Sequence, residues 1–136
     1  MEAKGSKVMP ELKYTKTNEW AKVEGHMVTV GLTDFAQHEM TDIVFAEVPK
    51  IGAMAKQGTT LTSVESVKAV SDFVSPVSGE VVKVNPELEN QPELMNKDPY
   101  GKGWMAVIKM ANPKELDNLL NAEAYVKFLE TEYKSH

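Results

Sequence analysis

The chain has 136 residues, 42% of them hydrophobic, which is enough to bury one modest core and too little for a second. It carries 15 basic and 20 acidic residues, a formal net charge of -5, with no lysine run or basic patch to follow a phosphate backbone, so a nucleic-acid partner is disfavoured. There is no cysteine, which excludes disulfides, thiolate metal sites and a cysteine nucleophile.

Membrane insertion is also disfavoured by the sequence. No stretch approaches the roughly 20 apolar residues that span a bilayer, and residues 1–10 lack the features of a signal or transit peptide. We therefore expect a cytoplasmic protein with no membrane partner; the alternative is a mitochondrial matrix protein whose transit peptide has been removed. Because His26, His38 and His136 lack metal-ligand spacing, no metal site is expected.

Short β-like runs recur at hairpin spacing, separated by glycine and proline. They predict strands at 27–32, 42–48, 59–66, 70–74, 80–85 and 104–110, and Thr33 with Asp34 predicts the start of a helix that ends at Met40. This pattern is typical of a small sandwich or flattened barrel. Pro-x-x-Gly occurs at 49–52 and again at 76–79, either by chance or because the fold has two related halves.

The end of the chain is predicted to be helical. Asn112 at the cap, Pro113 at the first position and Glu115 at the third indicate a helix start. Further on, an apolar stripe at helical spacing favours a terminal helix packed on the sandwich over an interaction helix; its residues are Ala122, Tyr125, Val126 and Leu129. We expect one domain, 1–136, with C-terminal helices within 112–132.

The most informative residue is Lys68. It lies between the predicted strands 59–66 and 70–74, at the position where a hairpin must turn. A lysine at a hairpin tip is exposed and can be acylated by another enzyme. We therefore predict an attachment site at Lys68.

The sequence around Lys68 resembles that of a known family. Val64-Glu65-Ser66-Val67-Lys68-Ala69, followed by Ser-Pro-Val-Ser-Gly-Glu-Val-Val at 75–82, is similar to the lipoate attachment hairpin of glycine cleavage system H proteins. The resemblance continues, in order, through Leu12-Lys13-Tyr14, Glu19-Trp20, residues 30–37, Asp42-Ile43-Val44-Phe45 and residues 96–104. It therefore covers nearly the whole chain.

The resemblance implies both a fold and a cofactor. The fold is mainly β, a lipoyl/biotinyl-type flattened β-barrel (barrel-sandwich hybrid) with short helices including a C-terminal helical segment, and its lipoyl-binding core would span 27–109. The cofactor is lipoate, bound covalently to Lys68 as N6-lipoyllysine.

The resemblance also implies a function, that of a non-catalytic carrier subunit. Lipoate on Lys68 would take the aminomethyl group of glycine from the pyridoxal-phosphate glycine decarboxylase (P protein) to the tetrahydrofolate-dependent aminomethyltransferase (T protein). Dihydrolipoyl dehydrogenase (L protein) would then reoxidise the arm, and lipoylating enzymes would be further partners.

Two groups of site residues follow from the family motifs. Glu65, Ser66 and Ala69 would form the turn that a lipoylating enzyme recognises, although Glu65 and Ser66 would also suit an ordinary polar hairpin face. Glu19 and Asp72 would line a cleft that shelters the arm, with the Glu19 carboxylate pairing with a cationic amine. The alternatives are a solvated carboxylate for Glu19 and a turn or strand-end cap for Asp72.

Four positions depart from the family pattern. Asn18 stands where the family often has histidine, and Thr41 where glycine commonly precedes Asp-Ile-Val. His38 and Glu39 also differ. These departures weaken the cleft assignment without affecting Lys68.

The sequence also bears on other carrier functions and on a catalytic function. A biotinyl domain would have Met-Lys-Met at the modified lysine, and the lipoyl domain of a 2-oxoacid dehydrogenase acyltransferase commonly has Asp-Lys-Ala, whereas this chain has Val67-Lys68-Ala69. An octanoyl or lipoyl relay that donates to other lipoyl domains would also use Lys68, and it remains the alternative function. A hydrolase is disfavoured because no set of catalytic residues converges.

Overall fold

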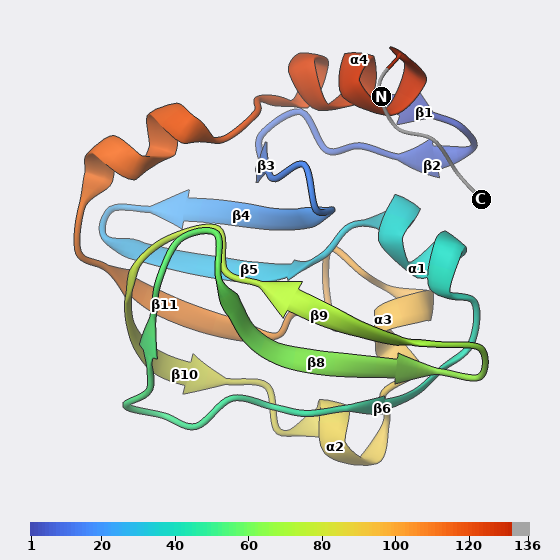
Figure 1. Ribbon diagram of the computed structural model, residues 1–136, viewed down its shortest axis with the longest axis horizontal. Coiled ribbons are helices and arrows are strands. Elements are labelled where there is room, and N and C mark those ends of the chain that lie inside the picture. Colours follow the sequence, from blue (N-terminus) through green and yellow to red (C-terminus); the bar gives the residue numbers. More distant parts are fainter. Residues whose placement is uncertain (132–136) are drawn as a thin grey trace.

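The computed structural model describes residues 1–131, which form two β layers with helices at their edges (Figure 1). The larger sheet has six strands in the order β3-β4-β5-β11-β10-β7, and the smaller has three in the order β6-β8-β9. The strands are β1 (Glu2–Ala3), β2 (Ser6–Lys7), β3 (Lys13–Tyr14), β4 (Glu19–Glu24), β5 (Met27–Leu32), β6 (Ile43–Ala46), β7 (Met54–Ala55), β8 (Thr60–Ser66), β9 (Val70–Val74), β10 (Gly79–Val84) and β11 (Ala106–Met110). The helices are α1 (Asp34–Met40), α2 (Glu87–Asn90), α3 (Leu94–Lys97), the 3-10 helix η1 (Pro113–Asn118) and α4 (Ala122–Thr131).

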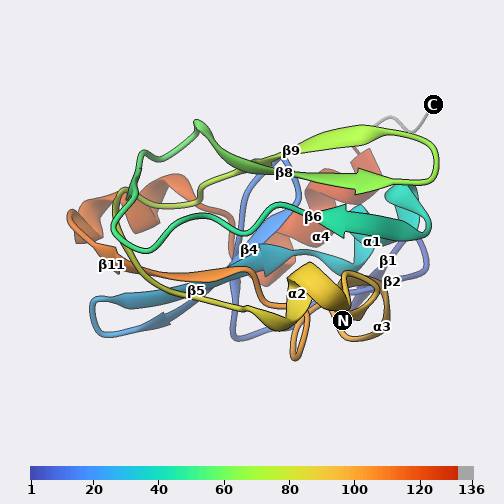
Figure 2. The same ribbon diagram turned by 90° about the horizontal axis from the view of Figure 1, so that it is seen from below.

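The two sheets face each other, and the core lies between them (Figure 2). Alternate residues along each strand point inward, as the two-residue period of a β-strand requires. On β5 the inward residues include Val28 and Val30, and on the small sheet they include Val64 and Phe73, all of which are buried. The sheets do not close into one continuous barrel, and the predicted barrel-sandwich fold is confirmed.

A second apolar cluster joins α4 to the N-terminal segment. The Tyr125 ring of α4 stacks on Tyr14 with 4.4 Å between ring centroids, and its hydroxyl lies 2.9 Å from Thr33 Oγ1 and donates to Asn18 Oδ1 at 2.8 Å. Ala122 and Leu129 are buried beside it. The prediction of a packed terminal helix is therefore confirmed.

The predicted strands are found within two residues of their expected bounds, and α1 begins after its predicted cap, since Thr33 Oγ1 accepts from Ala36 N at 3.1 Å. The two-residue strands β1, β2, β3 and β7 were not predicted. Strand β4 was also missed, because the buried Glu19 at its start breaks the expected polar and apolar alternation. The short helices α2 and α3 carry no side-chain cap that a sequence pattern could reveal.

The helix predicted after Asn112 is a 3-10 helix rather than an α-helix. Asn112 caps it as expected, accepting from Lys114 N at 3.1 Å. Glu115, however, accepts from the backbone N–H and the hydroxyl of Ser78, both at 2.7 Å. Its carboxylate therefore ties η1 to the loop before β10 instead of closing a capping box.

The two Pro-x-x-Gly segments lie side by side. Gly52 N donates to Val81 O at 2.7 Å, Val81 N donates to Ala53 O at 2.9 Å, and β7 pairs with the start of β10 at Ala55 and Gly79. Gly79 has φ 154, and a Cβ there would lie 1.9 Å from the Lys109 carbonyl oxygen. Only glycine fits at this point, where β10 lies this close to the backbone of β11.

Thr41, one of the departures from the family pattern, ends α1 in a strained conformation. Its φ is 62 and its ψ is -145, a region that glycine occupies readily and a β-branched residue rarely does. The backbone is held there because Thr41 N donates to Gln37 O at 3.0 Å and its carbonyl accepts from Asn96 Nδ2 at 2.7 Å. The backbone conformation at this position therefore explains why the family commonly has glycine there.

We predict that Thr41→Gly stabilises the protein by about 1 kcal/mol. Relief of roughly 1–3 kcal/mol of strain outweighs the roughly 0.5–1 kcal/mol of extra backbone entropy in the unfolded chain. Urea unfolding at neutral pH measures the change. The neighbouring Asp42→Gly, at a position without positive φ, should be destabilising, and a Thr41→Gly variant less stable than the parent would contradict the strain.

Candidate functional site

Lys68 is exposed at the tip of the β8–β9 hairpin, which forms one end of the small sheet in Figures 1 and 2. Ser66 shapes the turn: its Oγ accepts from Lys68 N at 3.2 Å and from Ala69 N at 3.1 Å, while its own N–H donates to Ala69 O at 2.8 Å. Val67 N donates to Asp42 O at 3.0 Å, which ties the tip to the segment before β6. The backbone under the lysine is therefore fixed while its side chain faces solvent.

The predicted recognition residues surround Lys68. Glu65 and Ala69 are exposed, and Ser66 is nearly buried because it is directed into the turn. Glu65 pairs with Val70 on β9 and with Phe45 on β6, and these two apolar side chains are also exposed. An enzyme that approaches the tip thus meets a carboxylate beside apolar groups.

Asp72 lies in the middle of β9, in register with Ser63, and is exposed on the outer face of the small sheet. It occupies neither a turn nor a strand end, so the structure does not support the alternative role of a cap. Glu19 lies on the inner side of the large sheet, so the structure does not place these two carboxylates on one surface.

Glu19 is 0% exposed, which rules out the solvated carboxylate considered as its alternative role. Its Oε1 accepts from Thr15 Oγ1 and from Thr17 Oγ1, both at 2.5 Å. Its Oε2 accepts from the backbone N–H of Val74 on β9 at 3.1 Å, so one side chain joins the two sheets. Burial raises the pKa of Glu19 to about 7, although the hydrogen bonds from Thr15, Thr17 and Val74 act in the opposite direction.

A pocket of about 410 Å³ lies next to Glu19. It is lined by the three residues that donate to the Glu19 carboxylate together with residues of the β7–β8 turn and η1: Thr15, Lys16, Thr17, Gln57, Gly58, Val74, Ser75, Asn118 and Leu119. The carboxylate lies behind this lining, so its charge can act on a group in the pocket without direct solvent contact. Because the lining comes from four separate segments, the family motif identified only Glu19. Residues 15–19 are all polar, so no alternation marks which of them face the pocket.

Within residues 1–131 no helix is long and apolar enough to cross a bilayer. Among the same residues no group of three or more histidine or acidic side chains is arranged to hold a metal ion. His136, considered in the sequence, lies outside the described residues.

Comparisons with known proteins point to one family. The family model described as Glycine cleavage H-protein matches residues 12–132. The glycine cleavage system H protein of Coprothermobacter proteolyticus is 54% identical over 124 residues, covering 90% of this chain and 98% of that protein, and that of Symbiobacterium thermophilum is 52% identical over 121 residues, covering 89% and 94%. Among solved structures, a glycine cleavage system H protein from Mycobacterium marinum superposes with a TM-score of 0.80 at 31% identity, covering 88% of this chain and 97% of that one.

The buried Glu19 predicts a specific pH dependence of stability. Its carboxyl pKa is raised from 4.5 to about 7 on folding, so between these values the folded state keeps a proton that the unfolded state has released. The free energy of unfolding should therefore fall as pH rises through this window, by up to about 3 kcal/mol from this group, and the contribution should be complete below its lower end.

Urea unfolding between pH 4 and about 8 tests this dependence. Glu19→Gln should flatten the slope, whatever its effect on absolute stability, because an amide does not titrate in this range. Glu65→Gln removes an exposed carboxylate and should leave the slope unchanged. Parallel slopes in the parent and Glu19→Gln would show that Glu19 titrates normally.

Proposed function

The chain belongs to the glycine cleavage H-protein family and serves as a lipoyl carrier in glycine cleavage; from this premise we propose that Lys68 holds lipoate as N6-lipoyllysine. One observation carries the proposal: Lys68 is exposed at the tip of a hairpin whose backbone is fixed on both sides. Its side chain takes part in no hydrogen bond or ion pair recorded within residues 1–131. Its amine is thus free to form an amide.

The residues at the tip fit such an attachment. Ala69 is small and leaves the approach to the amine open, while Ser66 keeps the turn in one conformation. When bound, lipoate supplies a disulfide and dithiol couple that can take up and release the aminomethyl group of glycine. The protein residues supply a rigid anchor from which a flexible arm can reach several enzymes at high local concentration.

We further propose that the pocket beside Glu19 shelters the end of the arm. Thr15, Thr17 and Val74 line it and donate to the Glu19 carboxylate, which lies behind them. A cationic amine in the pocket would favour the ionised form of Glu19 and lower its pKa from about 7. Asp72, exposed on β9, would meet the arm outside the pocket.

The remaining assignments concern other proteins. We propose that this chain catalyses no step itself, and that glycine decarboxylase, aminomethyltransferase and dihydrolipoyl dehydrogenase act in turn on the arm. Membership of the family supports this division of labour. Lipoylating enzymes would recognise the tip through Glu65, Ser66 and Ala69.

Lys68→Arg should abolish lipoylation and with it glycine decarboxylation and exchange in a reconstituted system. The charge is kept, and a change at an exposed turn should alter stability by less than about 0.5 kcal/mol. Intact mass and the glycine exchange assay are the measurements. Lys56→Arg, exposed in the turn at the opposite end of β8, is the matched control and should remain fully active; activity in the Lys68 variant would refute the attachment site.

Ser66→Ala should slow lipoylation several-fold and cost about 1 kcal/mol of stability, because Lys68 N and Ala69 N lose their shared acceptor. The readouts are the rate of mass gain with a lipoylating enzyme and urea unfolding. Ser71→Ala removes a hydroxyl from the same hairpin that makes a long 3.5 Å hydrogen bond to Asp72 O, and it should behave like the parent. An unchanged lipoylation rate in Ser66→Ala would mean that the turn need not be preformed.

A further inference from the structure

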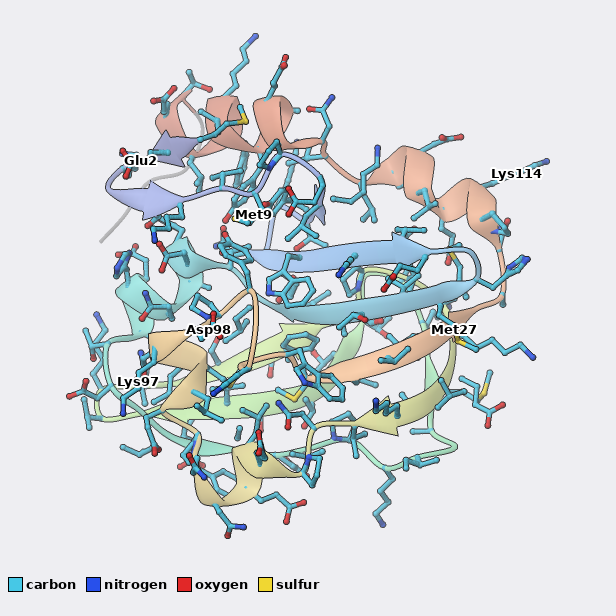
Figure 3. The ribbon with its side chains drawn as sticks, turned by 180° about the vertical axis from the view of Figure 1, so that it is seen from behind. Glu2, Met9, Met27, Lys97, Asp98 and Lys114 are labelled. Carbon is cyan, nitrogen blue, oxygen red and sulfur yellow. The ribbon has the colours of Figure 1, made fainter. Side chains whose placement is uncertain are left out.

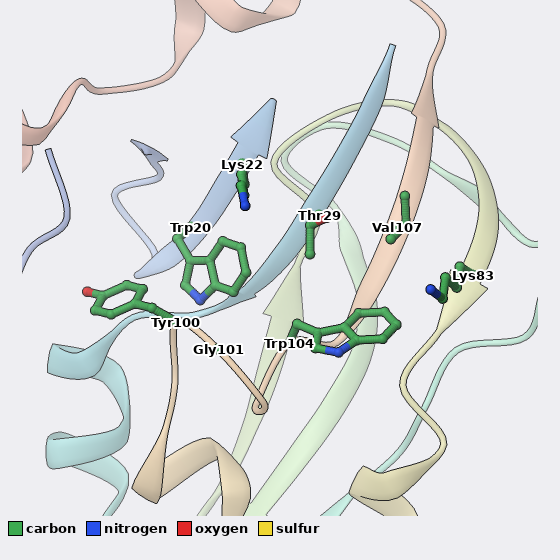
Figure 4. Close-up of a pocket in the computed structure, with 8 residues that line it drawn as sticks. All are labelled: Trp20, Lys22, Thr29, Lys83, Tyr100, Gly101, Trp104 and Val107. Carbon is green, nitrogen blue, oxygen red and sulfur yellow. The ribbon is translucent and has the colours of Figure 1, made fainter. Parts of the chain in front are cut away.

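A second pocket lies on the outer face of the large sheet, the face turned away from β6, β8 and β9. Figure 3 views the molecule from this side, and Met27 marks one edge of the face. The pocket has a volume of about 330 Å³. Its lining residues, drawn in Figure 4, are Trp20, Lys22, Thr29, Lys83, Tyr100, Gly101, Trp104 and Val107.

The floor of the pocket is one row of residues that crosses four strands in register. Lys22 on β4 pairs with Thr29 on β5, Thr29 pairs with Val107 on β11, and Val107 pairs with Lys83 on β10. Three strand spacings of about 4.8 Å place the two lysine backbones roughly 14 Å apart. A lysine thus lies at each end of the pocket floor, and the middle of the floor consists of the Thr29 and Val107 side chains.

Aromatic side chains form the walls, and their positions are fixed. Trp20 lies over Gly31, where a Cβ would come within 2.7 Å of its ring, and its Nε1 donates to Pro99 O at 3.0 Å. Tyr100 is 6.1 Å from Trp20 between ring centroids. Trp104, only half-buried, has Lys83 Nζ 5.6 Å from its ring centroid. The half-buried ring of Trp104 therefore has a cation over its face.

The charges at this pocket are one-sided although the chain carries a net charge of -5. Lys22 and Lys83 are the charged residues in its lining, and no ion pair is recorded for either within the described chain. On the same face, Glu24 and Glu80 lie one row further along the strands, where Glu80 pairs with Lys109.

One further carboxylate lies close to the pocket. Asp98 lies beside the lining residue Gly101 and accepts from Lys102 N at 2.9 Å. The two lysines of the lining outnumber this carboxylate, so the pocket favours an anion.

We propose that this pocket binds a planar aromatic group that carries a carboxylate or a phosphate. The ring would lie against Trp104 above Thr29 and Val107, and the anionic group would meet Lys83 or Lys22. Aromatic stacking, paired cations and a volume at the lower end of the usual range for small-molecule sites all fit such a ligand. The site is separate from Lys68, which lies on the other sheet, so it does not depend on the proposed lipoyl attachment.

The two tryptophans of the chain make the proposal easy to test, because both line this pocket. Full-length protein labelled with 15N is titrated with AMP as an aromatic phosphate and with 2-naphthoate as an aromatic carboxylate. Adenosine and inorganic phosphate serve as matched ligands that lack the charge or the ring. We expect the indole N–H signal of Trp104 to shift saturably with one or both aromatic anions, at least tenfold more weakly with adenosine, and not at all with phosphate.

Variants locate the binding. Lys22→Gln or Lys83→Gln, whichever removes the lysine that meets the anionic group, should weaken the better anion at least fivefold. Lys109→Gln, on the same face one row away, should bind like the parent. These changes are at exposed positions, and a dispersed amide spectrum verifies folding. The proposal is overturned if neither aromatic anion shifts the signal at millimolar concentration, if adenosine binds equally well, if neither lysine variant of the pocket weakens binding, or if Lys109→Gln weakens binding as much as the more affected of those two variants. Saturation by a short acidic peptide at lower concentration than either anion would overturn it in favour of a protein partner.

Discussion

The small sheet that carries Lys68 is positioned by its contact with the large sheet, and Glu19 is the polar link in that contact. Apolar residues on both inner faces hold the layers together through non-directional burial, which does not by itself fix how one sheet lies along the other. The hydrogen bond from Val74 N to Glu19 Oε2 is directional, and it fixes the end of β9 relative to β4. The position of the hairpin therefore depends on a buried carboxylate.

Burying the Glu19 carboxylate costs free energy of folding, and the surrounding hydrogen-bond donors offset part of that cost. Three donors, from Thr15, Thr17 and Val74, satisfy its oxygens, yet burial still raises its pKa to about 7. An apolar residue would pack at such a position without this penalty. On the proposal above, the adjacent pocket gives this charge a role, since a buried negative charge would attract a cation.

Much of the fold was predictable because local signals agreed with the final packing. Strands β5, β6, β8, β9, β10 and β11 have clear breakers, and the cap at Thr33 and the stripe through Tyr125 and Leu129 were both confirmed. Two of the misses share one physical cause, which is that long-range partners decide them. Glu115 binds Ser78 instead of closing a capping box, and Glu19 was not predicted to be buried because its partners lie in the β3–β4 turn and on β9 of the other sheet.

The functional site, too, could be predicted from the sequence only in part. The hairpin tip that carries Lys68 could be located from the strand pattern because a turn depends on neighbours in the sequence, whereas Ser66 was indicated only by the family motif. The pockets could not, because each is assembled from several segments. The two ends of the β8–β9 hairpin are held differently. At the tip the backbone is fixed while the Lys68 amine is free. At the base, Val74 N donates to the Glu19 carboxylate across the core. A carrier needs both, since an arm can sample several partners only if its anchor stays in place while they exchange.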